Sequence, residues 1–215
     1  MTSSTIPSAT SGNDLLIGRE GRNDYINGGR GNDTIRGLSG NDTLLGGDGN
    51  DILNAGNGND TAYGGAGNDL ISGLTGAVLF DGGTGNDTIT GNSRDNFLRG
   101  NRGNDVLEGG SGNDTISGGT GDDDINGDGG ADVLRGGDGK DTIDGGDGND
   151  TLIGGNGADT LTGGSGKDTL SGGAGIDSIV GGADDDVITG GAGADQLSGG
   201  DRKDTFVDTS DTDSG

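Results

Sequence analysis

Aspartate recurs at a fixed spacing in this chain, and its carboxyl group can serve in acid–base catalysis or in cation binding. From Asp24 to Asp204, a position visited every nine residues is Asp in 19 of 21 repeats, and the exceptions are Val78 and Asn96. Asp14 adds a leading copy, displaced by one inserted residue. Acid–base catalysis requires carboxyl groups in distinct environments. Equivalent, repeated carboxylates instead favour the binding of a hard cation.

Composition excludes most other chemistry. The 215 residues include 37 acidic and 12 basic side chains, giving a formal charge of −25, and there is no Cys and no His. Disulfides, ordinary zinc, haem and iron–sulfur sites, and Ser-His or Cys-His catalytic sets are therefore excluded. A surface this acidic repels phosphate backbones, so no nucleic-acid partner is expected. We predict that the chain is not an enzyme.

The Asp positions belong to a nine-residue frame, Gly-Gly-x-Gly-x-Asp-x-apolar-x, as in residues 46–54. The eighth slot is Ile or Leu in 18 of 21 repeats. Gly permits tight turning, so slots one to six predict a turn. Slots seven to nine are short and rich in β-branched residues, which predicts three-residue strands whose middle side chain points inward.

Two successive repeats can form one coil of 18 residues, with the Ile and Leu side chains enclosed between two parallel sheets. Stacking of about ten such coils gives a solenoid. Only 25% of the residues are apolar, which does not offset the entropy of ordering so many glycines. Ca²⁺, which prefers six to eight carboxylate and carbonyl oxygens, supplies stabilisation and relieves the repulsion among the stacked Asp side chains.

The frame resembles the RTX (repeats-in-toxin), or haemolysin-type, calcium-binding nonapeptide repeat over nearly the whole chain. The resemblance implies an all-β fold, a right-handed parallel β-roll with rows of Ca²⁺ along both edges. It also implies type I secretion and folding in calcium-rich extracellular medium. The implied metal ligands are the Asp residues of the sixth slot, namely Asp14, Asp24, Asp33, Asp42, Asp51, Asp60, Asp69, Asp87, Asp105, Asp114, Asp123, Asp132, Asp141, Asp150, Asp159, Asp168, Asp177, Asp186, Asp195 and Asp204.

The chain divides into a polar N-terminal segment (1–11), the β-roll (12–207) and a polar C-terminal tail (208–215). The first segment lacks the basic start and apolar stretch of a Sec-type signal peptide, and no apolar run reaches transmembrane length. Val78 and Asn96 lie 18 residues apart and so fall on the same edge. That edge is predicted to lack full calcium sites there, whereas the edge from Asp33 to Asp195 is continuous.

Three functions remain open from the residues alone. The first is a non-catalytic calcium-binding module that folds after secretion and acts as a scaffold. The second is an adhesive protein that binds ice or a polysaccharide through outward Thr residues, although Leu79 and Phe97 interrupt that Thr ladder. The third is the C-terminal module of a secreted protease, lipase or epimerase. Besides calcium ions, the expected partners are a larger secreted protein or a surface polymer.

Overall fold

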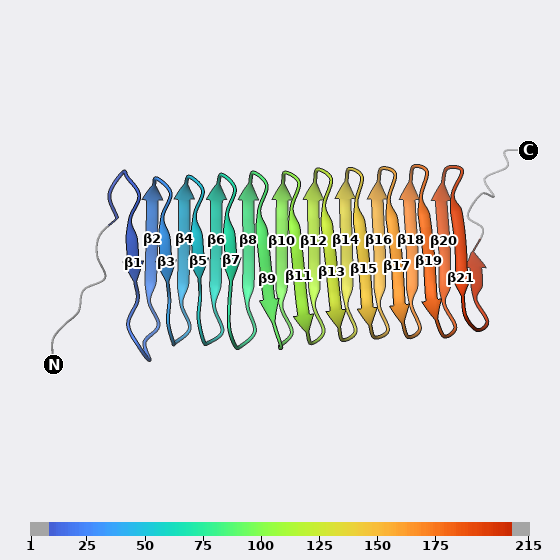
Figure 1. The fold of residues 1–215 in the computed structure, drawn as a ribbon, viewed down its shortest axis with the longest axis horizontal. Helices are drawn as coiled ribbons and strands as arrows, with labels where there is room; N and C mark the ends of the chain where they lie inside the picture. Colours follow the sequence, from blue (N-terminus) through green and yellow to red (C-terminus); the bar gives the residue numbers. More distant parts are fainter. Residues whose placement is uncertain (1–8, 208–215) are drawn as a thin grey trace, which may run out of the picture.

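The computed structural model describes residues 9–207, so most of the predicted segment 1–11 and all of 208–215 lie outside the described residues. The chain forms two parallel sheets of 11 strands each, stacked as an elongated roll with turns along its two long edges (Figure 1). Odd-numbered strands make one sheet and even-numbered strands the other. Residues 9–207 contain no helix that is long and apolar enough to cross a membrane.

The odd sheet consists of β1 (Leu15–Ile17), β3 (Thr34–Arg36), β5 (Ile52–Asn54), β7 (Leu70–Ser72), β9 (Thr88–Asn92), β11 (Val106–Ser111), β13 (Asp124–Gly129), β15 (Thr142–Asp147), β17 (Thr160–Ser165), β19 (Ser178–Ala183) and β21 (Gln196–Gly200). The even sheet consists of β2 (Tyr25–Arg30), β4 (Thr43–Asp48), β6 (Thr61–Ala66), β8 (Leu79–Thr84), β10 (Phe97–Arg102), β12 (Thr115–Thr120), β14 (Val133–Asp138), β16 (Thr151–Asn156), β18 (Thr169–Ala174), β20 (Val187–Ala192) and β22 (Thr205–Val207).

The register confirms the predicted parallel solenoid. Strands pair with those one coil away, so that Leu98 lies opposite Ile116 and Ile116 opposite Leu134. Eleven strands in each sheet make about 11 coils rather than ten. The leading repeat that contains Asp14 accounts for the difference, because it contributes β1.

The prediction of three-residue strands was wrong for most of the chain. Typical strands have six residues, as in β12, and continue through slots one to three of the next repeat. The glycines there still pair with the neighbouring coils, because Gly119 lies opposite Asn101 on one side and Gly137 on the other. The turn is therefore confined to slots four to six, where Gly148 adopts a φ of 152° that favours Gly.

The core between the two sheets consists of eighth-slot side chains from both sheets, joined by Ala55 and Val78. Leu44, Phe80 and Leu152 have no exposed surface. In the last coil, by contrast, Leu197 and Phe206 are 38% and 53% exposed. Apart from the last, each coil thus buries two apolar side chains against its neighbours. This narrow core positions the sixth-slot Asp residues immediately before each strand.

Candidate metal centre

The sixth-slot residues form two rows along the two edges of the roll. Row one precedes the strands of the even sheet and comprises Asp24, Asp42, Asp60, Val78, Asn96, Asp114, Asp132, Asp150, Asp168, Asp186 and Asp204. Row two precedes the strands of the odd sheet and comprises Asp14, Asp33, Asp51, Asp69, Asp87, Asp105, Asp123, Asp141, Asp159, Asp177 and Asp195. All are at most 4% exposed except Asp14, Asp195 and Asp204, which lie in the end coils and are partly exposed.

Each buried Asp uses one carboxylate oxygen to join two coils. The backbone N–H of Asp69 donates to Oδ1 of Asp87 over 2.8 Å, and that of Asp87 donates to Oδ1 of Asp105 over 2.7 Å. The second oxygen, Oδ2, is buried and has no hydrogen-bond partner in Asp33, Asp42, Asp51, Asp60, Asp69, Asp87, Asp105, Asp114, Asp123, Asp132, Asp141, Asp150, Asp159, Asp168, Asp177 and Asp186. Such atoms are costly to leave unsatisfied.

The unpartnered oxygen points toward the first-slot glycine of its own repeat. A Cβ added at Gly46 would clash with Oδ2 of Asp51, and it would lie 2.5 Å from the carbonyl oxygen of Gly64 in the next coil. Gly154 has the same relation to Asp159 and Gly172. Only a residue without a side chain leaves carboxylate and carbonyl oxygens facing one another. These glycines were predicted to serve only in turning, and the available signal for this second role was their offset of five residues from Asp in most repeats.

Burial raises the pKa of many of the buried row residues, and in several of them the charges of neighbouring Asp side chains add to the effect. The pKa is raised to about 7 in Asp87, Asp123 and Asp132. It is raised to about 6 in Asp51 and Asp141. At neutral pH these carboxyl groups therefore require either a proton or a nearby cation.

The donor set fits a hard cation. Ca²⁺ binds carboxylate and carbonyl oxygens, which are the atoms that converge beside each first-slot glycine. Among the side chains of residues 9–207, no group of three or more His, Cys, Asp or Glu converges as a metal cluster.

A second ladder, missed by the sequence analysis, runs along the fifth slot. Oδ1 of Asn32 accepts the N–H of Asn50 over 3.0 Å, and Oδ1 of Asn50 accepts the N–H of Asn68 over 2.9 Å. These bonds run in the opposite direction along the roll to those of the Asp rows. The recurring Asn-Asp pair was the available signal, and it joins the turns without any cation.

Row one is interrupted at two successive positions. Val78 offers no oxygen, and a Cβ at Gly73 would meet the Phe80 ring at 3.0 Å and Val78 at 3.3 Å rather than a carboxylate. Asn96 donates from Nδ2 to Oδ1 of Asp114 over 3.1 Å and leaves its own Oδ1 unpartnered. Before the interruption, fully buried Ala55 takes the first slot where the frame has Gly.

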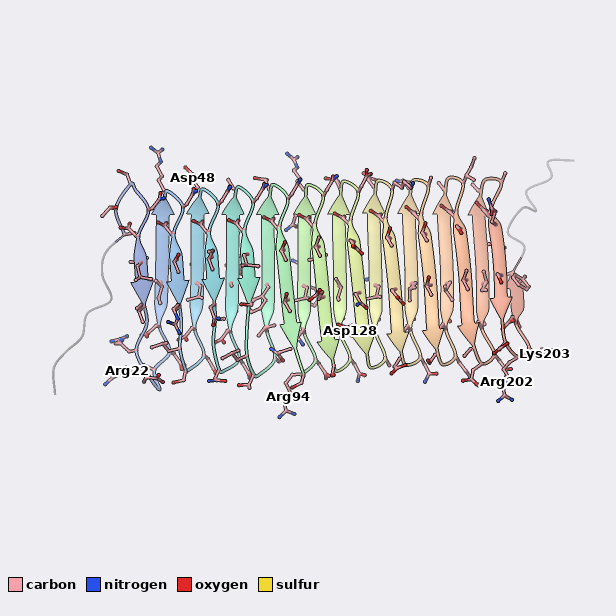
Figure 2. All side chains as sticks on the ribbon, viewed as in Figure 1. Arg22, Asp48, Arg94, Asp128, Arg202 and Lys203 are labelled. Carbon is pink, nitrogen blue, oxygen red and sulfur yellow. The ribbon has the colours of Figure 1, made fainter. Side chains whose placement is uncertain are left out.

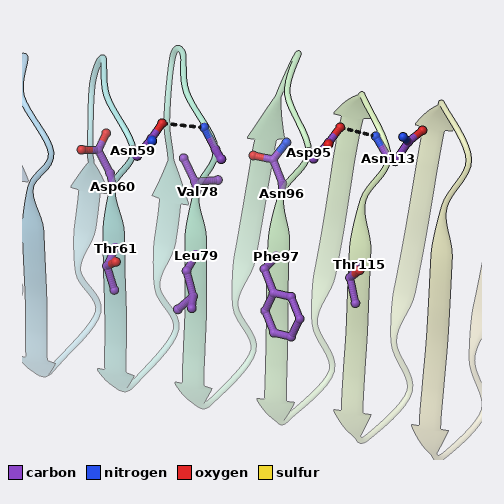
Figure 3. Close-up of a pocket in the computed structure, with 11 residues that line it drawn as sticks. Asn59, Asp60, Thr61, Val78, Leu79, Asp95, Asn96, Phe97, Asn113 and Thr115 are labelled. Atoms are coloured by element: carbon purple, nitrogen blue, oxygen red, sulfur yellow. Dashed lines mark hydrogen bonds between the residues drawn. The ribbon is translucent and has the colours of Figure 1, made fainter.

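An open groove of about 440 Å³ lies over this interruption (Figure 3). Asp60, Val78 and Asn96 line it on the side of the turns, and Phe97 lies on the strand beside them. The fifth-slot ladder is also broken here, because Ala77 accepts no hydrogen bond through its side chain, and the ladder resumes where Oδ1 of Asp95 accepts the N–H of Asn113 over 2.8 Å. The interruption thus removes anionic oxygens while the backbone register is kept.

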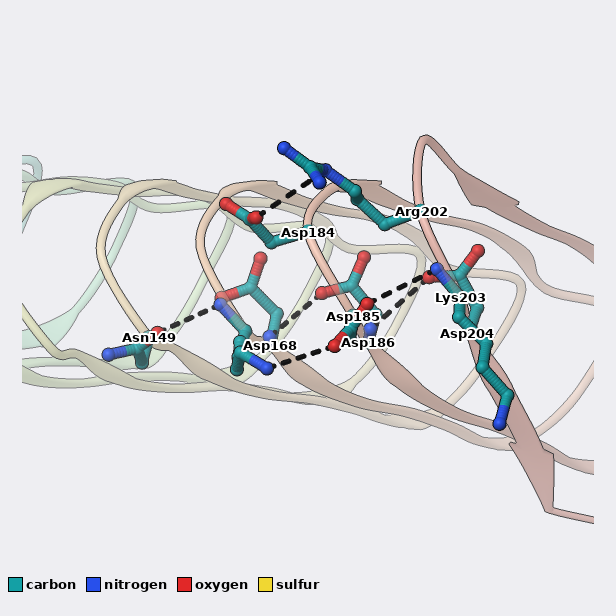
Figure 4. Close-up of polar contacts among 9 residues, drawn as sticks. Asn149, Asp168, Asp184, Asp185, Asp186, Arg202, Lys203 and Asp204 are labelled. Atoms are coloured by element: carbon teal, nitrogen blue, oxygen red, sulfur yellow. Dashed lines mark hydrogen bonds and ion pairs between the residues drawn. The ribbon is translucent and has the colours of Figure 1, made fainter.

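At the C-terminal end the turns keep their shape although Gly is replaced. Asp184 and Arg202 occupy the fourth slot with φ values of 75° and 84°. Lys167 forms an ion pair with Asp185 over 3.0 Å, and the backbone N–H of Lys203 donates to Asp185 (Figure 4). Figure 2 shows Arg202 and Lys203 at this end of the roll, at the edge where the turns lie.

The family comparison agrees with this geometry. A family model described as the RTX calcium-binding nonapeptide repeat matches residues 8–44, 20–53, 45–79, 81–116, 117–152, 135–170, 144–179 and 171–206. A solved structure described as a hyperactive, Ca²⁺-dependent, β-helical antifreeze protein from an Antarctic bacterium is 24% identical, with a TM-score of 0.41, over 94% of this chain and 78% of that one. No curated protein matches the chain.

Proposed function

The chain belongs to the RTX calcium-binding nonapeptide repeat family, and we propose that it is a non-catalytic module that folds outside the cell when Ca²⁺ binds. The observation that carries this proposal is the set of buried Oδ2 atoms without partners, which recurs along both rows. Sixteen such atoms are far more than a stable fold normally leaves unsatisfied. Cation binding is the simplest way to satisfy them together.

Each residue of the frame has a distinct part in this binding. Oδ1 of the sixth-slot Asp stays on the backbone N–H of the preceding coil, and Oδ2 remains free to hold the ion. The first-slot glycines of adjacent coils admit the ion and offer carbonyl oxygens, as Gly46 and Gly64 do beside Asp51. Bound Ca²⁺ supplies the positive charge that offsets repulsion between Asp side chains in neighbouring coils.

Folding is expected to depend on this charge. The formal charge is −25 and the apolar core is one side chain wide on each strand. Low hydrophobicity with high net charge is typical of disordered chains. Calcium binding and folding are therefore expected to be one coupled transition.

Low cytosolic calcium would keep the chain unfolded until it leaves the cell, which suits a type I export route. Once folded, the rod would act as a scaffold or folding module for a larger secreted protein. These roles rest on the calcium dependence proposed above and stay predictions.

The Thr residues do not favour an ice- or polysaccharide-binding face. The two sheets divide them between opposite faces, so neighbouring coils share at most two seventh-slot Thr residues in a row. In the odd sheet the pair is Thr142 and Thr160, followed by Ser178. In the even sheet, Leu79 and Phe97 replace Thr in two adjacent strands. The outward faces are better explained as solvated surfaces.

Calcium titration monitored by far-UV circular dichroism tests the proposal. In calcium-free buffer at pH 7.5 we expect a disordered spectrum, and added Ca²⁺ should produce β signal cooperatively with a midpoint of roughly 10⁻⁴–10⁻³ M. Mg²⁺ at equal concentration is the control, and it should fail because it resists cages of many carbonyl oxygens. A folded spectrum in calcium-free buffer, unchanged by Ca²⁺, would contradict the proposal.

A further inference from the structure

The first repeat of row one departs from the frame in one respect. Asp14 and Asp24 are ten residues apart instead of nine, and this longer turn contains Arg19. Arg19 follows the first-slot glycine, Gly18, where most repeats have a second Gly. This turn therefore places a cationic side chain beside the first Asp of row one.

Arg19 binds the Asp24 carboxylate through both oxygens. Nε donates to Oδ1 over 2.8 Å, Nη2 contacts the same oxygen, and the backbone N–H donates to Oδ2 over 2.5 Å. The Asp24 side chain is fully buried, and the Arg19 side chain is 38% exposed. Asp24 is thus absent from the set of row residues with an unpartnered Oδ2.

The arrangement in which a first-slot glycine leaves a carboxylate and a carbonyl oxygen facing one another, here called the glycine cradle, is nevertheless present at this position. A Cβ at Gly18 would lie 2.5 Å from the Gly37 carbonyl oxygen and 2.9 Å from Oδ2 of Asp24. These are the same neighbours that surround Oδ2 of Asp51. Oδ2, the oxygen that has no partner in the later coils, is held here by the backbone N–H of Arg19, and the guanidinium binds Oδ1, the oxygen that elsewhere accepts an N–H of the preceding coil.

The first residue of row two is also satisfied by the chain itself. Oδ2 of Asp14 accepts the backbone N–H of Thr10 over 2.6 Å and the Thr10 hydroxyl over 2.9 Å. At the other end of the roll, within residues 9–207, the hydrogen bond to the Asp204 carboxylate comes from the N–H of Asp186. Arg202 there lies toward Asp184 instead (Figure 4). The two ends of the roll are therefore chemically different.

We propose that Arg19 makes a calcium ion unnecessary at the first position of row one, because its guanidinium neutralises the Asp24 carboxylate and its backbone N–H satisfies Oδ2, so that the N-terminal coil closes without calcium. The inference rests on the proposed function, because it concerns where the ion row begins. Row one then starts at Asp42, whose Oδ2 is unpartnered. In a solenoid each coil is stabilised by its neighbours, so the closed coil offers a template from which calcium-dependent folding proceeds toward the C-terminus.

Ion stoichiometry separates the two kinds of position. Asp24→Asn should leave the number of bound Ca²⁺ ions unchanged, whereas Asp42→Asn should lower it by about one, because Asn supplies no anionic oxygen. Isothermal titration calorimetry of the full chain gives both counts at saturating calcium. Equal losses in the two variants would overturn the inference while leaving calcium-dependent folding intact.

Arg19→Gln tests the cation itself, and Arg22→Gln is the matched control. Arg22 is exposed in the same turn (Figure 2) and forms no ion pair with Asp24. Hydrogen exchange at calcium concentrations below the folding midpoint should show protection of residues 15–26 in the wild type and in Arg22→Gln, and its loss in Arg19→Gln. At saturating calcium, Arg19→Gln should gain about one ion at the vacated carboxylate.

Arg19→Lys distinguishes charge from geometry. Lys keeps the charge but loses the planar fork, so it should restore part of the protection at low calcium and exclude the extra ion. If Arg19→Gln matches Arg22→Gln in protection and ion count, the inference fails and the proposed function stands. If no variant responds to calcium, both fail together.

Discussion

Row one and row two carry the same motif, but only row two is continuous. In row two every coil presents an Asp from Asp14 to Asp195. In row one the frame fails at Val78 and Asn96, and Ala55 alters the cradle beside Asp60. Both rows nevertheless keep the same 18-residue strand register. Backbone pairing therefore sets the shape of the roll, and we propose that the carboxylates determine how many cations it binds.

Asn96 shows that the backbone hydrogen bond at a row position can be kept without the charge of Asp. Its backbone N–H still donates to Oδ1 of Asp114 over 2.7 Å, as an Asp would, but the residue adds no charge. We therefore expect a continuous row to be the most stabilised part of the roll when cations are bound. Without cations it is the most costly part, because desolvated like charges lie in adjacent coils.

The largest expected effect is that, in calcium-free solution, the continuous row destabilises the roll instead of stabilising it. Burial, with help from neighbouring carboxylates, raises the pKa of Asp87 and Asp123 in row two to about 7. Because the folded-state pKa exceeds the ordinary value, the stability that these groups contribute is present below about pH 4 and is lost as pH rises toward 7. We expect β signal at pH 4 in calcium-free buffer and its loss by pH 8, measured by circular dichroism.

Asp87→Asn/Asp123→Asn should weaken this pH dependence, because two groups no longer titrate. The exposed pair Asp122→Asn/Asp124→Asn changes the charge equally and should leave the dependence nearly as it is. A calcium-free spectrum that does not change from pH 4 to pH 8 would show that the buried carboxyl groups do not control folding.

With calcium present, the same double substitution in row two should destabilise the folded roll, the reverse of its effect without calcium. Asn keeps the Oδ1 acceptor but removes the anionic Oδ2, so two ion positions are weakened. We expect the calcium midpoint to rise by roughly threefold or more above its starting value in the 10⁻⁴–10⁻³ M range. The Asp122→Asn/Asp124→Asn control should stay within experimental error of the wild type. Indistinguishable midpoints would mean that row two does not hold the ions.

Much of this architecture is predictable from the sequence because the repeat is so regular. The inward eighth slot, the parallel register and the position of the row-one interruption follow from a nine-residue period and an 18-residue coil. The strand length was wrong because Gly was taken to end a strand, whereas Gly119 continues to pair with both neighbouring coils.

The details of the site depend on three-dimensional neighbours that a pattern does not specify. The contact of Arg19 with Asp24 arises from a turn with one extra residue, whose path is set by packing. The fifth-slot Asn ladder was visible as a repeat, but the direction of its hydrogen bonds required coordinates. Residues that break the frame were therefore the hardest to interpret.

Restoring the missing carboxylates of row one should make its calcium binding more like that of row two. Val78→Asp/Asn96→Asp restores two anionic side chains and two acceptors for the N–H groups of the preceding coils. We expect about two more bound ions, counted by calorimetry, and a lower calcium midpoint. Hydrogen exchange should also slow in β8 and β10 relative to the wild type, where this stretch should exchange first as calcium falls. An unchanged ion count would mean that the interruption has another cause than missing carboxylates.

The smallest expected effect concerns Ala55, which occupies a first slot in row one. Its methyl group occupies the same slot as Gly46, where an added Cβ would clash with the Asp carboxylate of that repeat. Ala55→Gly should therefore open the cradle beside Asp60. Gly also costs roughly 0.5–1 kcal/mol of backbone entropy, and in the wild type Val78 supplies no second carboxylate. The substitution alone should therefore leave the calcium midpoint nearly unchanged. Combined with Val78→Asp/Asn96→Asp it should lower the midpoint further, and additive effects in this cycle would show that the methyl group does not obstruct the site.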